Sequence, residues 1–129
     1  GDLLVWFYED LAGIKSDSIE TGFKKIVMRP VPVNGLNHVK ASYHSVHGLI
    51  SSEWKTENEI FDWNITVPAN TTALVAVPAK DAAEVTESGK KAADSEGVKF
   101  LRMDGDRAVF EIGSGTYDFV SKNFRSKEF

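Results

Sequence analysis

The residues most able to do chemistry in this sequence are three histidines, His38, His44 and His47, which fall within ten residues of one another. A metal site needs several such ligands to converge on one ion. Positions three apart on a strand point to opposite faces, so His44 and His47 would converge only across a bend. No cysteine and no nearby carboxylate at ligand spacing completes a set. We therefore interpret the histidines as loop and turn residues, and we predict no metal site and no bound cofactor.

Paired carboxylates are the second candidates, because general acid–base catalysis commonly uses two of them. One group surrounds a predicted turn and the other flanks a glycine: Glu53, Glu57, Glu59 and Asp62, and Asp104 with Asp106. The second group has a structural explanation, since Asp-Gly is the strongest short-range signal for a tight hairpin. The first group lies where the chain must turn through water, whereas a raised catalytic pKa needs burial or a close like charge. We predict that no residue of this sequence is catalytic.

Two tryptophans suggest a different function, because aromatic platforms stack on sugar rings. Trp54 and Trp63 both fall on the inward phase of predicted strands, together with Ile50, Phe61 and Ile65. We therefore favour a place in the hydrophobic core for both indole rings. Carbohydrate binding through surface aromatics remains the alternative.

The composition is that of one globular domain of 129 residues, with 42% hydrophobic and 26% charged residues. The formal net charge of −4 argues against nucleic acid or an anionic membrane as a partner, since both reward clustered Lys and Arg. No run approaches the roughly 18 apolar residues of a membrane-spanning helix. The absence of cysteine excludes disulfides and thiolate chemistry together.

The first element that the sequence predicts is a helix of about three turns over residues 2–13, with Asp2 as its cap and Gly13 at its end. Apolar side chains cover most of its circumference: Leu3, Leu4, Val5, Trp6, Phe7, Tyr8 and Leu11. Such a helix needs neighbours on several sides, and a single sheet covers only one of them. We therefore expect it to belong to a helical domain that lies mostly outside this sequence, with residues 1–14 as the part included here.

Residues 15–22 are polar and predict a linker, after which the hydrophobic period changes from helical to alternating. Seven or eight short strands without intervening helices then predict a mainly β fold, an antiparallel β-sandwich over residues 23–122. Residues 123–129 form a predicted tail. The predicted core includes Ile50, Trp54, Phe61, Trp63, Ile65, Val67 and Val109.

The clearest local signal is "ITVPANTTALVAVPA", residues 65–79. Two alternating apolar runs flank a turn at residues 68–71, and this pattern predicts a β-hairpin. Residues 79–97 are polar, with a short strand predicted around Val85 and weak helical character on either side of it.

The order of several segments resembles the C-terminal end of bacterial α-L-rhamnosidases, which are inverting glycoside hydrolases with an (α/α)6 catalytic barrel. "WFYEDLAGI" is similar to the last helix of that barrel, and "VPANTTALVAVPA" is the phrase most typical of the C-terminal sandwich. The similarity continues through residues 22–32, 39–54, 85–90 and 113–119. Any one of these segments is weak evidence for the family, but together and in this order they form a specific signature of it.

The resemblance implies that the chain is a non-catalytic accessory domain of a longer bacterial hydrolase. The two catalytic carboxylates of the family lie upstream, in the barrel, so no residue here inherits either role. It also implies that Leu3, Leu4, Trp6 and Phe7 pack against the rest of the barrel. The parent chain would act on rhamnosylated glycans, in the periplasm or outside the cell.

Overall fold

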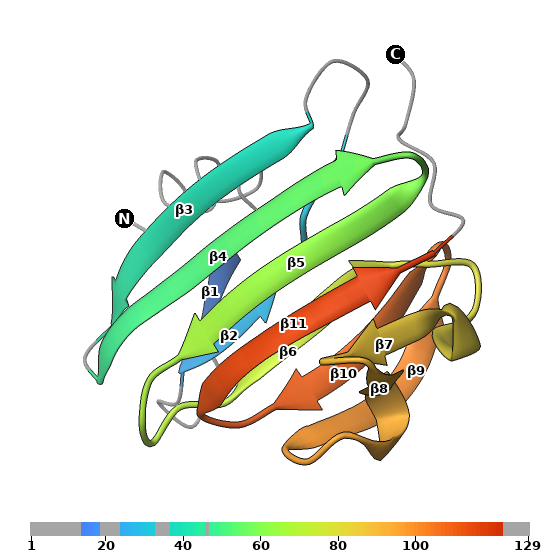
Figure 1. The fold of residues 1–129 in the computed structure, drawn as a ribbon. Helices are drawn as coiled ribbons and strands as arrows, with labels where there is room; N and C mark the ends of the chain where they lie inside the picture. The colour runs from blue at the N-terminus through green and yellow to red at the C-terminus, as the bar shows by residue number, and fades with distance from the viewer. Residues whose placement is uncertain (1–13, 19–23, 33–36, 46, 123–129) are drawn as a thin grey trace.

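The computed structural model describes residues 14–18, 24–32, 37–45 and 47–122, which form two β-sheets packed face to face (Figure 1). The predicted mainly β sandwich is confirmed. The five-stranded sheet has the order β1 (Ile14–Ser18), β2 (Lys24–Met28), β6 (Ala73–Pro78), β10 (Arg107–Ile112), β9 (Val98–Asp104). The six-stranded sheet has the order β3 (His38–Ser45), β4 (Gly48–Glu57), β5 (Ile60–Val67), β11 (Gly115–Ser121), β7 (Val85–Glu87), β8 (Lys90–Lys91).

The helical content of the described residues is limited to two short 3₁₀ turns, η1 (Ala82–Glu84) and η2 (Ala92–Asp94). They flank β7 and β8 in the polar segment where weak helical character and a short strand were predicted. No helix in the described part of the chain has the length and apolar character needed to cross a bilayer. The helix predicted over residues 2–13 and the tail 123–129 lie outside the described residues.

Three tight hairpins build most of the sheets. β3 pairs with β4, β4 with β5, and β9 with β10, all antiparallel. The β4–β5 turn holds Asn58 and Glu59 at φ values of 53° and 64°, which is the backbone geometry that a two-residue turn of this kind requires. Gly105, at φ 59°, begins the β9–β10 turn. The predicted turn at Asp104–Asp106 is therefore in place.

The hairpin predicted over residues 65–79 is wrong. β5 pairs with β4 and β11, whereas β6 pairs with β2 and β10 in the other sheet, so the intervening turn carries the chain from one sheet to the other. The turn itself is as predicted, with Asn70 at φ 59° and the Thr71 hydroxyl donating to the Ala69 carbonyl oxygen at 3.2 Å. Alternation identifies the buried face of each strand, but both sheets bury their faces in the same core, so alternation cannot say which sheet a strand joins.

The first part of the predicted linker over residues 15–22 lies in β1, and its remaining residues lie outside the described ranges. This strand pairs antiparallel with β2, from Ile14 opposite Met28 to Ser18 opposite Lys24. A polar sequence does not prevent such pairing, since the ladder is made by backbone N–H and C=O groups.

The predicted core residues are all buried, and most of them lie between the two sheets. Val109 is the predicted core residue that does not lie between the two sheets. It is 5% exposed but lies outside the main cluster, because its neighbours Ala108 and Phe110 take the inward face of β10. Val109 is instead covered on the opposite face, beside Ala76 of β6.

A continuous layer of aromatic rings fills the space between the sheets. Centroid distances are 5.6 Å from Trp54 to Phe61, 5.9 Å from Phe61 to Trp63, and 6.4 Å from Trp63 to Phe119. Phe119 of the six-stranded sheet then meets Phe110 of the five-stranded sheet at 5.7 Å. The Trp63 indole N–H donates to the Ser52 hydroxyl at 2.8 Å, which satisfies its one polar atom inside the core.

Truncation of Phe110, whose ring contacts Phe119 of the other sheet, should lower the stability of the domain. We expect Phe110→Ala to lower the free energy of unfolding by about 3–5 kcal/mol, because Phe110 is fully buried and its removal leaves a cavity. Phe100→Ala is the matched control: this ring contacts Phe110 but is already 36% exposed, so its loss should cost about 1 kcal/mol. Urea denaturation measures both, and equal losses would contradict this packing.

Candidate functional site

The histidines do not converge. His38 and His44 lie on β3, and His47 lies in the turn before β4. The His38 Nε2 atom is 2.7 Å from the Glu53 Oε2 atom of the neighbouring strand, and this hydrogen bond lowers the pKa of Glu53. Within the described ranges, no group of three or more His, Cys, Asp and Glu side chains is arranged to hold a metal ion.

The two tryptophans are unavailable as a sugar platform. Trp54 and Trp63 are both 0% exposed and stand in the aromatic layer described above. The core interpretation of these residues is confirmed. Phe100 is the one aromatic side chain among the exposed large hydrophobic residues of the described region, and it packs edge to face against Phe110.

The turn carboxylates that the sequence singled out are mostly solvated. Glu57 and Glu59 are exposed at the β4–β5 turn, and Asp104 and Asp106 are exposed at the β9–β10 turn. Asp62 differs from them because it is half-buried on the outer face of the six-stranded sheet.

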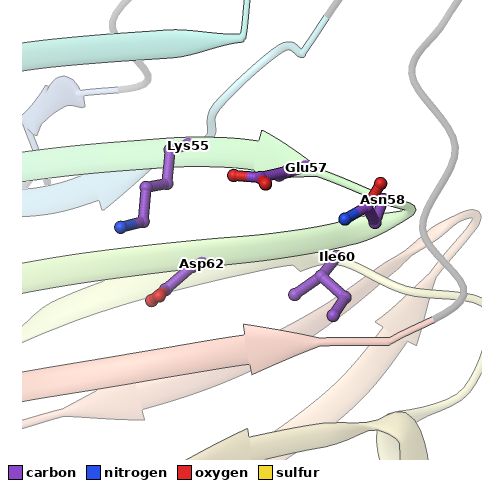
Figure 2. Close-up of a pocket in the computed structure, with 5 residues that line it drawn as sticks. All are labelled: Lys55, Glu57, Asn58, Ile60 and Asp62. Carbon is purple, nitrogen blue, oxygen red and sulfur yellow. The ribbon is translucent and has the colours of Figure 1, made fainter.

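A shallow depression of about 250 Å³ lies beside Asp62, on the outer face of β4 and β5 (Figure 2). Its lining consists of Lys55, Glu57, Asn58, Ile60 and Asp62. Lys55 stands directly opposite Asp62 in the β4–β5 ladder, so their side chains share one face of the sheet. The depression is open to solvent and carries charges of both signs.

Asp62 forms a pair with Asp118, which the sequence analysis missed. Asp62 lies opposite Val120 and Asp118 opposite Asn64, so the two carboxyls are diagonal neighbours on β5 and β11. A hydrogen bond to Asp62, then burial and the negative charges of Asp62 and Glu87, raise the pKa of Asp118 from its ordinary value of 3.8 to about 7. The alternation of "TYDFV" places Asp118 on the outer face, but nothing local in that sequence identifies its partner on β5.

Glu87 is the second carboxylate that the sequence analysis missed. It is 5% exposed and accepts hydrogen bonds from the hydroxyls of Ser88 and Ser95 and from the Asp118 backbone N–H. Although burial alone would raise the pKa of Glu87, these donors outweigh it and the pKa is lowered. The carboxylate therefore fastens the segment around η2 to β11.

The described residues therefore form a mainly β domain in which the buried aromatic residues are used for packing. The family model described as the bacterial α-L-rhamnosidase C-terminal domain matches residues 13–92. The chain belongs to this family.

Known proteins similar to this chain are α-L-rhamnosidases. The chain is 33% identical over 120 residues to one from Streptomyces avermitilis and 26% identical over 117 residues to one from Formosa agariphila. These alignments cover 93% and 91% of this chain, but only 11% and 12% of the relatives. The chain thus corresponds to about a tenth of the length of those relatives.

Two solved structures share the fold. The crystal structure of the Streptomyces avermitilis α-L-rhamnosidase complexed with L-rhamnose matches with a TM-score of 0.74 and 32% identity, over 91% of this chain and 10% of that one. The α-L-rhamnosidase from Dictyoglumus thermophilum matches with a TM-score of 0.72 and 30% identity, over 93% of this chain and 13% of that one.

The buried Glu87 carboxylate should stabilise the domain in a pH-dependent way. We expect Glu87→Gln to lower the free energy of unfolding by about 1–3 kcal/mol at pH 7. Both carboxylate oxygens of Glu87 accept hydrogen bonds, whereas the NH₂ group of a glutamine cannot accept one and would face a donor. Because the pKa of Glu87 is lowered on folding, its contribution is present above its ordinary value of 4.5 and is lost as the pH falls through the lowered value.

The wild type and Glu87→Gln should therefore converge in stability in acid. Urea unfolding at pH 7 and at pH 3 measures this difference, with Glu96→Gln at an exposed loop position as the matched control. A Glu87→Gln variant as stable as the control at pH 7 would show that these hydrogen bonds contribute nothing net.

Proposed function

We propose that the chain is the non-catalytic, structural C-terminal domain of an α-L-rhamnosidase. The observation that carries this proposal is its membership of the C-terminal domain family, together with its correspondence to about a tenth of the length of α-L-rhamnosidase relatives. The parent chain would be a glycoside hydrolase that removes terminal α-L-rhamnose from rhamnosylated glycans.

The chemistry of such a parent would use two carboxyl groups that lie outside this chain. In inverting hydrolysis, a carboxylic acid protonates the leaving glycosidic oxygen while a carboxylate activates water on the opposite face of the sugar. Asp62 and Asp118 are not assigned these roles, because they lie on the outer face of a sheet and the adjoining depression is open to solvent. The fully buried Trp54 and Trp63 likewise give the carbohydrate-binding alternative no support.

The proposed role of the domain is to pack against the catalytic region of the same chain. The predicted helix within residues 1–14 would be the last helix of the catalytic domain, with Leu3, Leu4, Trp6 and Phe7 in the contact. Residues 15–22 would connect it to the sandwich over residues 23–122, although β1 already joins the five-stranded sheet. Residues 123–129 would follow the sandwich as a tail.

The chain alone should have no glycosidase activity. With an aryl α-L-rhamnoside as substrate, we expect release of the phenol at the uncatalysed rate, because the proposal places both catalytic carboxyl groups upstream of these 129 residues. A longer chain that includes the upstream region should hydrolyse the same substrate and serves as the positive control. Hydrolysis by the 129-residue chain at a rate near that of an intact enzyme would contradict the proposal.

The apolar helix should matter only when the upstream region is present. In the longer chain, we expect Leu4→Asp with Phe7→Asp to destabilise the contact by about 3 kcal/mol or more, because a carboxylate would be buried without a partner. Glu9→Gln with Asp10→Asn removes charge at two polar positions of the same predicted helix and is the control. Thermal unfolding of the longer chain measures both, and equal melting temperatures for the two double variants would contradict the proposed contact.

A further inference from the structure

The carboxyl pair formed by Asp62 and Asp118 has a geometry that neither sheet packing nor the proposed function explains. The two side chains project from adjacent central strands of the six-stranded sheet and lie on its outer face. In the β5–β11 ladder the two residues are diagonal neighbours on the same face of the sheet. An ionised carboxyl only accepts hydrogen bonds, so two such neighbours can bond to each other only when one of them carries a proton.

The burial of the pair also indicates that one of the two carboxyls carries a proton. The Oδ1 atoms of Asp62 and Asp118 are both closed off from solvent, and no donor among the described residues reaches either of them. A buried carboxylate oxygen without a donor is costly, and two adjacent ones repel each other as well. A single shared proton removes one of the charges and supplies the missing donor.

The surrounding charges do not replace that proton. Lys55 of β4, opposite Asp62, is a cation that acts on Asp118, and it favours the ionised form. Glu87 of β7 acts in the opposite direction, because its negative charge disfavours ionisation of Asp118. Since the carboxylate of Glu87 accepts from the backbone N–H of Asp118, this charge is held next to the pair.

We propose that Asp62 and Asp118 hold one proton between them and form a pH-sensitive clasp across β5 and β11, closed in acid and loosened by repulsion when the proton is lost. The clasp lies directly over the aromatic layer. Phe119, the neighbour of Asp118 on β11, contacts Trp63, the neighbour of Asp62 on β5, at 6.4 Å. Repulsion at the surface of the sheet therefore acts on the strand pair that carries these rings.

The sign of the effect follows from the raised pKa of Asp118. A carboxyl whose pKa is higher in the folded protein contributes stability that is fully present below its ordinary value of 3.8. This contribution is lost as the pH rises through about 7, where the pair gives up its proton. The clasp therefore predicts a domain that is less stable at pH 8 than at pH 5.

Neutral isosteres test this prediction. An Asn amide at either position donates to the remaining carboxylate at every pH, so Asp118→Asn and Asp62→Asn should imitate the protonated pair. We expect each variant to raise the melting temperature at pH 8 by roughly 3–6 °C relative to wild type and to change it little at pH 5. Asp106→Asn, at an exposed turn, makes the same charge change and should leave the wild-type pH dependence intact.

The result that would overturn the clasp is a pH dependence of the melting temperature in both Asn variants that matches wild type. A direct measurement on the unaltered chain keeps the test decisive if a variant fails to fold. The ¹³C shifts of the Asp62 and Asp118 carboxyl carbons, followed by NMR from pH 3 to pH 9, should show one proton leaving the pair near pH 7. Complete ionisation of both groups below pH 5 would refute the proposal.

Discussion

Phe110 and Phe119 meet across the gap between the two sheets, and much of the domain depends on that contact. Their centroids are 5.7 Å apart, and each ring continues into an aromatic row of its own sheet. A pair of this kind contributes about 0.5–1.5 kcal/mol beyond the area it buries. The larger effect is geometric, because the rings set the separation at which all the smaller side chains between the sheets must fit. Aromatic residues committed to this packing cannot also present a flat surface to a sugar.

Local pattern predicted most elements of the fold and failed where the outcome depended on distant strands. The strands around Trp54, Trp63 and Phe110 follow from alternation, and the turn at Gly105 follows from its Asp-Gly sequence. The assignment of β6 to the other sheet does not follow, because it depends on β2 and β10 as partners. β1 was missed for a similar reason: its polar residues give no pattern, and its pairing with β2 is made by the backbone.

The candidate site shows the same division between local and distant information. In the sequence, Asp62 stands among the carboxylates near it in the chain, yet its structural partner is Asp118, more than fifty residues away on β11. The role of Glu87 could not be predicted either, since it accepts hydrogen bonds from Ser95 and from the backbone of Asp118, which are distant from it in the sequence. The environment of a carboxyl group depends on strand register, and that register is fixed by the buried faces of the sheets. The family resemblance, in contrast, rests on residue identities in sequence order and needed no knowledge of register.

The tryptophans of the sandwich serve its core and not a ligand. Tryptophan fluorescence of a Trp6→Phe variant tests this assignment most directly, because emission then comes only from Trp54 and Trp63. With both side chains 0% exposed, the emission should be blue-shifted, shielded from acrylamide, and unchanged by L-rhamnose or rhamnosyl oligosaccharides. Red-shifted emission that acrylamide quenches and that saturates with added sugar would overturn this assignment, since it would place an indole ring in a binding site.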